Sequence, residues 1–196
     1  MDAPVKHQQS LRDGLLSRQS VPPRLLEGPA PSQADIDDML AAAMCAPDHG
    51  AIRPWRFHVL RGAALNRLGD IFVAALKQRQ PNAPPETIEK ERSRPLRAPL
   101  IIAACAKIDQ ARAEKIPAVE QIVAVATACQ NILLAAHDKG FGAMMLTGTN
   151  ARDPHVKAAF GLEGPDEIVG FIYIGTPSGP AIEKQRPDPA EFTTIW

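Results

Sequence analysis

An almost wholly apolar stretch over residues 122–136 constrains this chain most. Pro117 stands near the expected first turn and Gly140 follows the last one, so the pattern predicts one long helix. Because such a helix is apolar on nearly all sides, it has no face suited to water. In a chain of 196 residues it must lie at the centre of the domain or in a subunit interface, and we expect a dimer.

The segments around this helix alternate between helix and strand patterns, which predicts an α/β (α+β) domain with a sheet covered by helices. Residues 100–106 form a continuous apolar run, typical of a central strand covered on both faces. Ser32 and Asp35 have capping-box spacing and open a helix that runs up to Pro47. Further helices are expected at residues 5–17, 63–79, 87–93 and 153–160, and further strands at 55–60, 141–146 and 167–174.

Charge and hydropathy exclude several kinds of partner. Lys and Arg number 22 and Asp and Glu number 22, so there is no basic excess for nucleic acid or an anionic membrane. No uninterrupted apolar run reaches the roughly 18 residues of a membrane span, and the first residues lack the pattern of a signal peptide. Cys45, Cys105 and Cys129 are widely spaced in apolar segments, which indicates reduced core thiols. We therefore expect a cytoplasmic protein.

The length favours a single domain over residues 1–196. A charged, proline-punctuated segment near residues 81–99 indicates a surface excursion, and a proline-rich segment near 177–196 an extended arm. Standard motifs for dinucleotides, P-loops, nucleophilic serines and zinc are missing. Cys45, Asp48 and His49 lie close together, but a helix end at Pro47 does not hold them on one face, so no metal is expected.

Arg18, Gln19 and Ser20 form the first chemically informative cluster, at the end of a predicted helix and before a rigid proline turn. A guanidinium offers paired donors to phosphate oxygens, and a hydroxyl adds a third. The alternative is a basic helix end that complements its own dipole.

Residues 46–55 form the second cluster, a proline-bounded loop between an apolar helix and a strand. Such loops present polar groups on rigid scaffolds, and His49 beside Gly50 can bond a ligand edge. The alternative is a capped helix end, with Trp55 as ordinary core.

These clusters, in this order and with this separation, resemble the flavin-dependent nitroreductase family, and most of all its small, single-domain NAD(P)H nitroreductases of the YdjA type. The likeness covers nearly the whole chain. Arg18-Gln19-Ser20 looks like the family's Arg-x-Ser phosphate motif, and Pro47-Asp48-His49 through Arg53-Pro54-Trp55 looks like its proline-rich flavin loop. Four later segments follow in the family's succession, at residues 97–102, 119–121, 139–142 and 169–177.

The resemblance implies a homodimer with a mixed central sheet and with FMN in two pockets built jointly by both subunits. Arg18 and Ser20 would hold the FMN phosphate, with Gln19 contributing through its backbone or amide. From the neighbouring subunit, Pro47, Asp48 and His49 would line the isoalloxazine ring. Its other side would be faced by the backbone of Met145, Leu146, Thr147 and Gly148.

Several positions depart from the family pattern. Gly50, Ala51 and Ile52 stand where many members carry a flavin-bonding Asn, so His49 is expected to substitute for it. Met145-Leu146 replaces a Trp-Arg pair, and Val119 replaces a Trp, so the pocket should be more apolar and less cationic than in its relatives. Pro22 occupies the place of a basic residue. Arg24 is its nearest substitute, a positive group for flavin N1 and O2.

The implied activity is ping-pong hydride transfer from NADH or NADPH to FMN and then to a nitroaromatic, quinone or other small electrophilic acceptor, with no catalytic side chain required. Two alternatives stay open at this level. One is a flavin-binding protein or a family member with other flavin chemistry, such as dehalogenation or flavin breakdown. The other is a cofactor-free dimeric α/β protein.

Overall fold

A five-stranded sheet forms the centre of the computed structural model, which describes residues 10–180 and 184–196. The strand order is β1-β5-β3-β2, with β4 also paired to β5. The longest strand, β5, therefore lies between β3 on one edge and β4 on the other. The strands are β1 (Leu26–Glu27), β2 (Trp55–Arg61), β3 (Leu100–Ala106), β4 (Gly142–Leu146) and β5 (Glu167–Pro177).

Every pair of these strands is antiparallel. Within the described ranges, parallel pairing is confined to one isolated bridge between Ser20 and Ala143. The expected mixed sheet is therefore almost entirely antiparallel. The bridge matters because it lays the segment after the first helix along β4.

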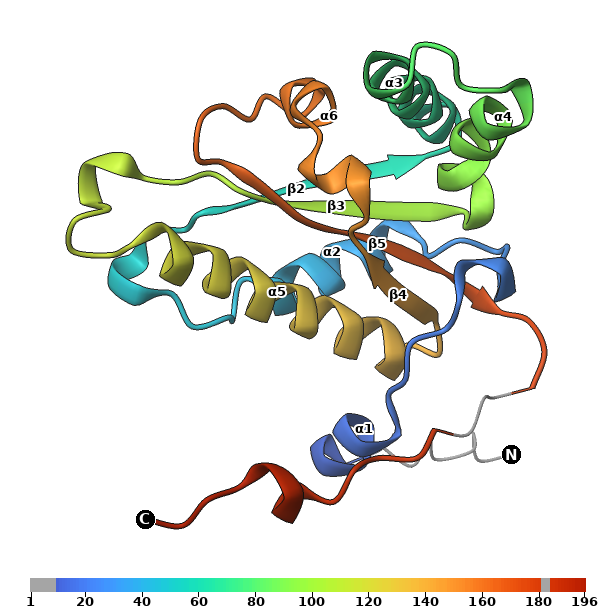
Figure 1. Cartoon of the computed structure of the whole chain (residues 1–196). Coiled ribbons are helices and arrows are strands. Elements are labelled where there is room, and N and C mark those ends of the chain that lie inside the picture. The colour runs from blue at the N-terminus through green and yellow to red at the C-terminus, as the bar shows by residue number, and fades with distance from the viewer. Residues whose placement is uncertain (1–9, 181–183) are drawn as a thin grey trace.

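Helices cover both faces of the sheet, α2 and α5 on one side and α3, α4 and α6 on the other (Figure 1). Successive residues of β3 alternate between the two layers: Ile102 packs with Ile132 of α5, and Ile101 packs with Phe72 of α3. All seven residues of β3 are buried, which confirms the doubly covered strand. The helices are α1 (Leu11–Ser17), α2 (Gln33–Ala43), α3 (Ala63–Arg79), α4 (Pro85–Ser93), α5 (Ala118–Asp138) and α6 (Pro154–Ala159).

Local sequence signals explain where these helices begin. The Ser32 hydroxyl accepts from the Asp35 backbone N–H, and the Asp35 carboxylate accepts from the Ser32 N–H, so the capping box is confirmed. The first helix begins at Leu11, capped by Ser10. The expected residues 5–9 of that helix lie outside the described residues.

The structure corrects the expectation that all three cysteines are core thiols. Cys45 is exposed at the end of α2, whereas Cys105 and Cys129 are buried as expected, and burial raises the pKa of both thiols to about 12. The segment near residues 81–99 contains α4, which packs on α3 and buries Glu91. Its expected short helix is confirmed as α4.

By length and composition alone, α5 is also apolar enough to cross a membrane. It packs instead on α2 and on strands β3, β4 and β5. Only 33% of its most apolar window is buried within the chain, so a large apolar surface remains uncovered. Val119, Val123 and Ala126 lie exposed along this helix.

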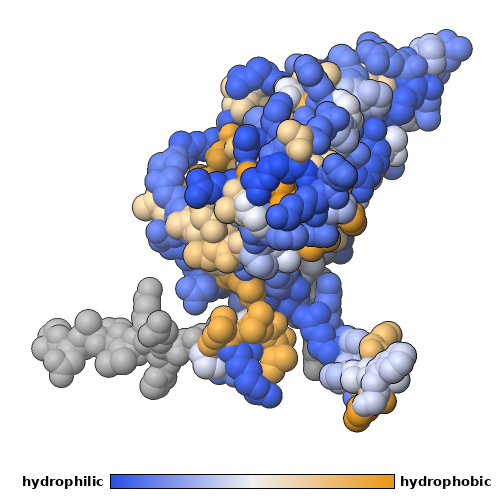
Figure 2. Space-filling view, turned by 90° about the vertical axis from the view of Figure 1, so that its left-hand side faces the viewer, coloured by the Kyte–Doolittle hydropathy of each residue, from blue (hydrophilic) through white to orange (hydrophobic). Residues whose placement is uncertain are grey.

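Two further apolar segments extend from the body. Helix α1 and the C-terminal arm lie below it, away from the sheet (Figure 1). Leu11 and Leu16 of α1 are 78% and 59% exposed. Phe192, Ile195 and Trp196 of the arm are each at least 75% exposed. Figure 2 shows apolar groups on two separate projections beneath the body of the molecule. Together with α5 they form a surface that suits contact with another chain.

Candidate functional site

A first cavity lies where the segment after α1 runs beside β4. The Val21 N–H donates to the Ala143 carbonyl at 3.0 Å, next to the Ser20 bridge, and this bond fixes the segment on the strand. Gln19 and Ser20 line the cavity, whose volume is about 360 Å³. At Gly142 a Cβ atom would lie 2.7 Å from Leu26 Cδ2, so glycine is needed for this close approach.

Arg18, which stands between the lining residues Ser17 and Gln19, meets a second arginine. The Arg186 guanidinium donates to the Arg18 carbonyl oxygen at 2.5 Å. The pKa of Arg18 is lowered, first by burial and then by the charge of Arg186. Among the described residues, no carboxylate pairs with either guanidinium. The pair is therefore a patch of uncompensated positive charge, suited to an anion.

A histidine extends this patch. The Ser17 hydroxyl and His137 Nε2, near the end of α5, are 2.9 Å apart. Burial, and then the charge of Arg18, lowers the pKa of His137, and Asp138 opposes them. A phosphate here would relieve the repulsion among these groups.

Sequence reasoning missed Arg186. The residue stands in the proline-rich arm, 168 positions from Arg18, and no local pattern links positions so far apart. Arg24, the expected positive group for the flavin ring, is exposed in a short 3-10 turn and does not line this cavity or the next.

A second and larger cavity, of about 580 Å³, lies at the other end of β4. One wall is lined by Met145, Leu146, Thr147 and Gly148, the four residues that were expected to face one side of a ligand together. The remaining lining residues come from α3, α4, the turn after α4, the 3-10 turn after β4 and β5, and include Arg79, Glu91, Arg94, Arg97, Asn150 and Tyr173. Three arginines thus line a cavity that Met145 and Leu146, which replace the family's Trp-Arg pair, gave no reason to expect to be lined by cationic residues.

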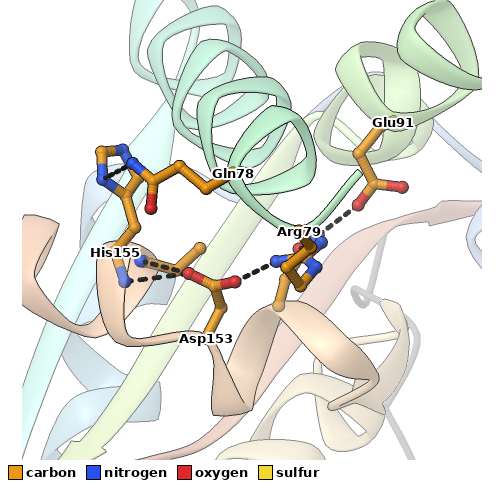
Figure 3. A network of polar contacts seen from close by, with 7 residues as sticks. Gln78, Arg79, Glu91, Asp153 and His155 are labelled. Atoms are coloured by element: carbon orange, nitrogen blue, oxygen red, sulfur yellow. Dashed lines mark hydrogen bonds and ion pairs between the residues drawn. The ribbon is translucent and has the colours of Figure 1, made fainter. Parts of the chain in front are cut away.

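A buried polar network holds this cavity in shape (Figure 3). Asp153 pairs with Arg79 and also accepts from the backbone N–H groups of His155 and Val156, so it caps α6. Asn150 accepts from Arg79 Nη2 at 3.2 Å and donates to Glu91. Glu91 in turn accepts from Arg94 Nε at 2.6 Å. The loop after β4 is therefore tied to both α3 and α4.

Replacing Asp153 with Asn should lower the free energy of unfolding by about 1–2 kcal/mol, because the amide retains an acceptor for the helix cap but loses the charged contact with Arg79. Thermal or urea unfolding measures the change. Asp70→Asn is the matched control, because Asp70 pairs with Arg92 at an exposed site where such a pair contributes little. Equal losses in both variants would contradict a structural role for the network.

The loop containing Pro47, Asp48 and His49 is rigidly held at a different place. Asp48 accepts from the Arg53 N–H at 2.7 Å, and Arg112 donates to the Gly50 carbonyl at 2.5 Å. Gly50 has φ +67°, which favours glycine. His49 Nδ1 lies 2.7 Å from Glu120 Oε2, on the first turn of α5. A third cavity, of about 510 Å³, is lined by Pro47, Asp48, His49 and Glu120 together with Val119 and Val123.

The expected site residues thus lie near opposite ends of α5. His49 contacts Glu120 near its start, whereas Ser17 contacts His137 near its end. The two positions are seventeen residues apart, about 26 Å along the helix axis. Arg18 and Ser20 therefore cannot share one small ligand with His49 of the same chain.

Comparisons with known proteins agree on one relationship. A family model described as "Nitroreductase family" matches residues 15–176. The Escherichia coli K12 protein named "Putative NAD(P)H nitroreductase YdjA" is 38% identical over 185 residues, covering 93% of this chain and 97% of that protein. The similarly named YfhC of Bacillus subtilis is 31% identical over 195 residues, covering 96% of each chain.

Solved structures share the fold. A nitroreductase-like family protein from Bacillus cereus superposes with a TM-score of 0.80 at 22% identity, covering 95% of this chain and 96% of that one. A nitroreductase from Bacteroides fragilis, solved with bound FMN, superposes with a TM-score of 0.69 at 20% identity, covering 94% and 97%.

Proposed function

Because this chain belongs to the nitroreductase family, we propose that it is an FMN-dependent NAD(P)H oxidoreductase that reduces a small electrophilic acceptor such as a nitroaromatic or a quinone. The proposal is carried by Arg18 and Arg186 at one end of β4, which have no carboxylate partner among the described residues, and by the 580 Å³ cavity at the other end. The five residues of β4 span about 17 Å. A phosphate joined to a planar ring by an extended chain suits that separation.

The chain's own residues suit each part of FMN. Arg18, Arg186 and the Ser20 hydroxyl would hold the phosphate, with Gln19 beside them. Gly142 leaves room for close backbone approach along the strand. The backbone of Met145, Leu146, Thr147 and Gly148 would face the ring, and Arg94 and Arg97 supply positive charge in the same cavity.

A second subunit would complete the site. If two chains pack α5 against α5 in antiparallel fashion about a two-fold axis, the start of one helix meets the end of the other. Pro47, Asp48 and His49 of one subunit would then approach Arg18 and Ser20 of the other. The exposed apolar stripe on α5 would be covered at the same time. We infer a homodimer with two equivalent sites.

When bound, FMN supplies the redox chemistry by accepting hydride from NAD(P)H at N5 and passing it to the acceptor. The protein binds FMN and the two substrates and orients them. Thr147 and Gly148 shape the wall of the cavity, and the network through Asn150 keeps that wall fixed on α3 and α4.

We infer one domain per chain, acting in the cytoplasm. The domain assignment is supported by the single sheet that both core layers share. The buried, unpaired thiols Cys105 and Cys129 suit a reducing compartment, where NAD(P)H is also produced.

The absorbance spectrum of the purified protein tests the cofactor assignment. A yellow protein with flavin bands, which releases FMN rather than riboflavin or FAD on denaturation, is expected. A colourless protein that does not bind added FMN would favour the cofactor-free alternative. Bound FMN without reduction by NADH or NADPH would indicate a flavin carrier or other flavin chemistry.

Replacing His49 with Ala should weaken FMN binding by about 1 kcal/mol, the size of one hydrogen bond, and leave the dimer assembled. His49 and Glu120 are both about half exposed, so loss of their pair should hardly change stability. Flavin titration and thermal unfolding measure the two effects. Glu120→Gln is the control, since it removes the pair but keeps the imidazole; an unchanged dissociation constant for FMN in His49→Ala would remove His49 from the site.

A further inference from the structure

The charges in the 580 Å³ cavity are unevenly compensated. Arg79 is neutralised by Asp153, and Arg94 by Glu91. Figure 3 shows the Arg79 contacts, which leave that side chain committed to α6 and the loop after β4. The third arginine, Arg97, takes part in no ion pair among residues 10–180 and 184–196.

Local contacts orient Arg97, but none of them is with a carboxylate of the described residues. Its Nε donates to the Arg94 carbonyl at 3.0 Å. Its guanidinium carbon lies 5.6 Å from the centre of the Tyr173 ring, over the ring face. These contacts use one N–H group and one face of the guanidinium. The Arg97 side chain is also within hydrogen-bonding reach of the Tyr173 hydroxyl.

Arg97 also stands across the cavity from the proposed flavin wall. Tyr173 of β5 pairs with Met144 of β4 on one side and with Ile101 of β3 on the other. Two strand spacings, about 10 Å, therefore separate β4 from β3, which follows Arg97 closely in the chain. A second small molecule can lie between the ring wall and Arg97, above Tyr173.

We propose that Arg97 is the anchor for a negatively charged group on the electron acceptor, so that the preferred acceptor is a small planar electrophile carrying a carboxylate, sulfonate or phosphate. The inference rests on the proposed function and goes beyond it, because neutral nitroaromatics and quinones need no such anchor. A guanidinium without a carboxylate partner binds an oxyanion through paired hydrogen bonds.

Matched charged and neutral compounds test the anchor on the FMN-loaded dimer. Benzoate and benzamide have similar shapes and are not reduced, so their dissociation constants, measured from perturbation of the flavin absorbance, report binding without turnover. The reducible pair is 4-nitrobenzoate and 4-nitrobenzamide, compared by kcat/KM. The variants are Arg97→Gln and the control Arg67→Gln, on the exposed surface of α3 outside the cavity.

The wild type and Arg67→Gln should bind benzoate more tightly than benzamide. In Arg97→Gln the benzoate preference, and the kcat/KM preference for 4-nitrobenzoate, should both fall about tenfold or more, as for loss of a charge-assisted bond. Equal binding of benzoate and benzamide by the wild type would overturn the proposal.

If Arg97 binds an anionic group of the nucleotide or of FMN instead of the acceptor, the same variants give different results. If Arg97 serves the nucleotide, Arg97→Gln should alter the rate of flavin reduction by NADPH or NADH and leave the acceptor preference unchanged. If it serves the flavin, the FMN dissociation constant should change instead. Either result overturns the acceptor anchor while the oxidoreductase assignment stands. A wild type that binds no flavin would contradict the proposed function itself.

Discussion

Replacing Ala126 with Glu should convert the protein from a dimer into a folded monomer with weak affinity for FMN. Ala126 lies in the middle of α5 and is exposed in the single chain, so the substitution should cost little in the monomer. In an α5-to-α5 dimer the same carboxylate would be buried without a partner, at a cost of several kcal/mol. Light scattering at micromolar concentration and circular dichroism separate loss of assembly from loss of folding.

Ala63→Glu is the matched control, because Ala63 is exposed at the first position of α3, on the other side of the sheet. It should remain dimeric and should bind FMN like the wild type. A wild-type monomer at micromolar concentration, or an Ala126→Glu variant that stays dimeric, would contradict the proposed assembly.

Removing both arginines of the cationic pair should abolish practical retention of FMN. Each single variant, Arg18→Ala or Arg186→Ala, should weaken binding by about 1.5–3 kcal/mol, the usual size of a hydrogen bond to a charged group. Both residues should be replaceable without unfolding, since Arg18 ends a short helix and Arg186 lies in the exposed arm. Flavin titration of the apoprotein measures the losses.

Riboflavin makes this test specific to the phosphate. The wild type should prefer FMN strongly over riboflavin, and the preference should shrink in each variant while riboflavin binding changes little. Arg12→Ala is the control, because Arg12 is exposed on the same helix, α1. Variants that lose FMN and riboflavin affinity equally would place the arginines outside the phosphate site.

Much of the fold follows from local patterns in the sequence. The capping box at Ser32 and Asp35, the apolar run of β3 and the long apolar helix α5 all stand where they were expected. Such features depend on residues a few positions apart, so periodicity and capping rules capture them. The two-residue strand β1 was missed, because its pairing with Thr176 and Pro177 depends on β5, far along the chain.

In the candidate site, too, groupings of adjacent residues could be predicted, whereas contacts between residues far apart in the chain could not. Arg18, Gln19 and Ser20 were recognised as a cluster because they are adjacent, and the structure keeps Gln19 and Ser20 together at one cavity. Long-range packing brings Arg186 to Arg18. It also brings Arg94 and Arg97 to the cavity lined by Met145–Gly148. Sequence analysis therefore did not find the arginines that α3 and the segment after α4 bring to the larger cavity.

The account depends most directly on one measurement, an anaerobic titration of the purified, FMN-loaded dimer with NADH and with NADPH. The account predicts that at least one nucleotide bleaches the flavin absorbance, with about one equivalent consumed per subunit, and that adding a quinone or nitroaromatic then restores it. A flavin that stays oxidised with both nucleotides would contradict the assignment of this protein as an NAD(P)H oxidoreductase.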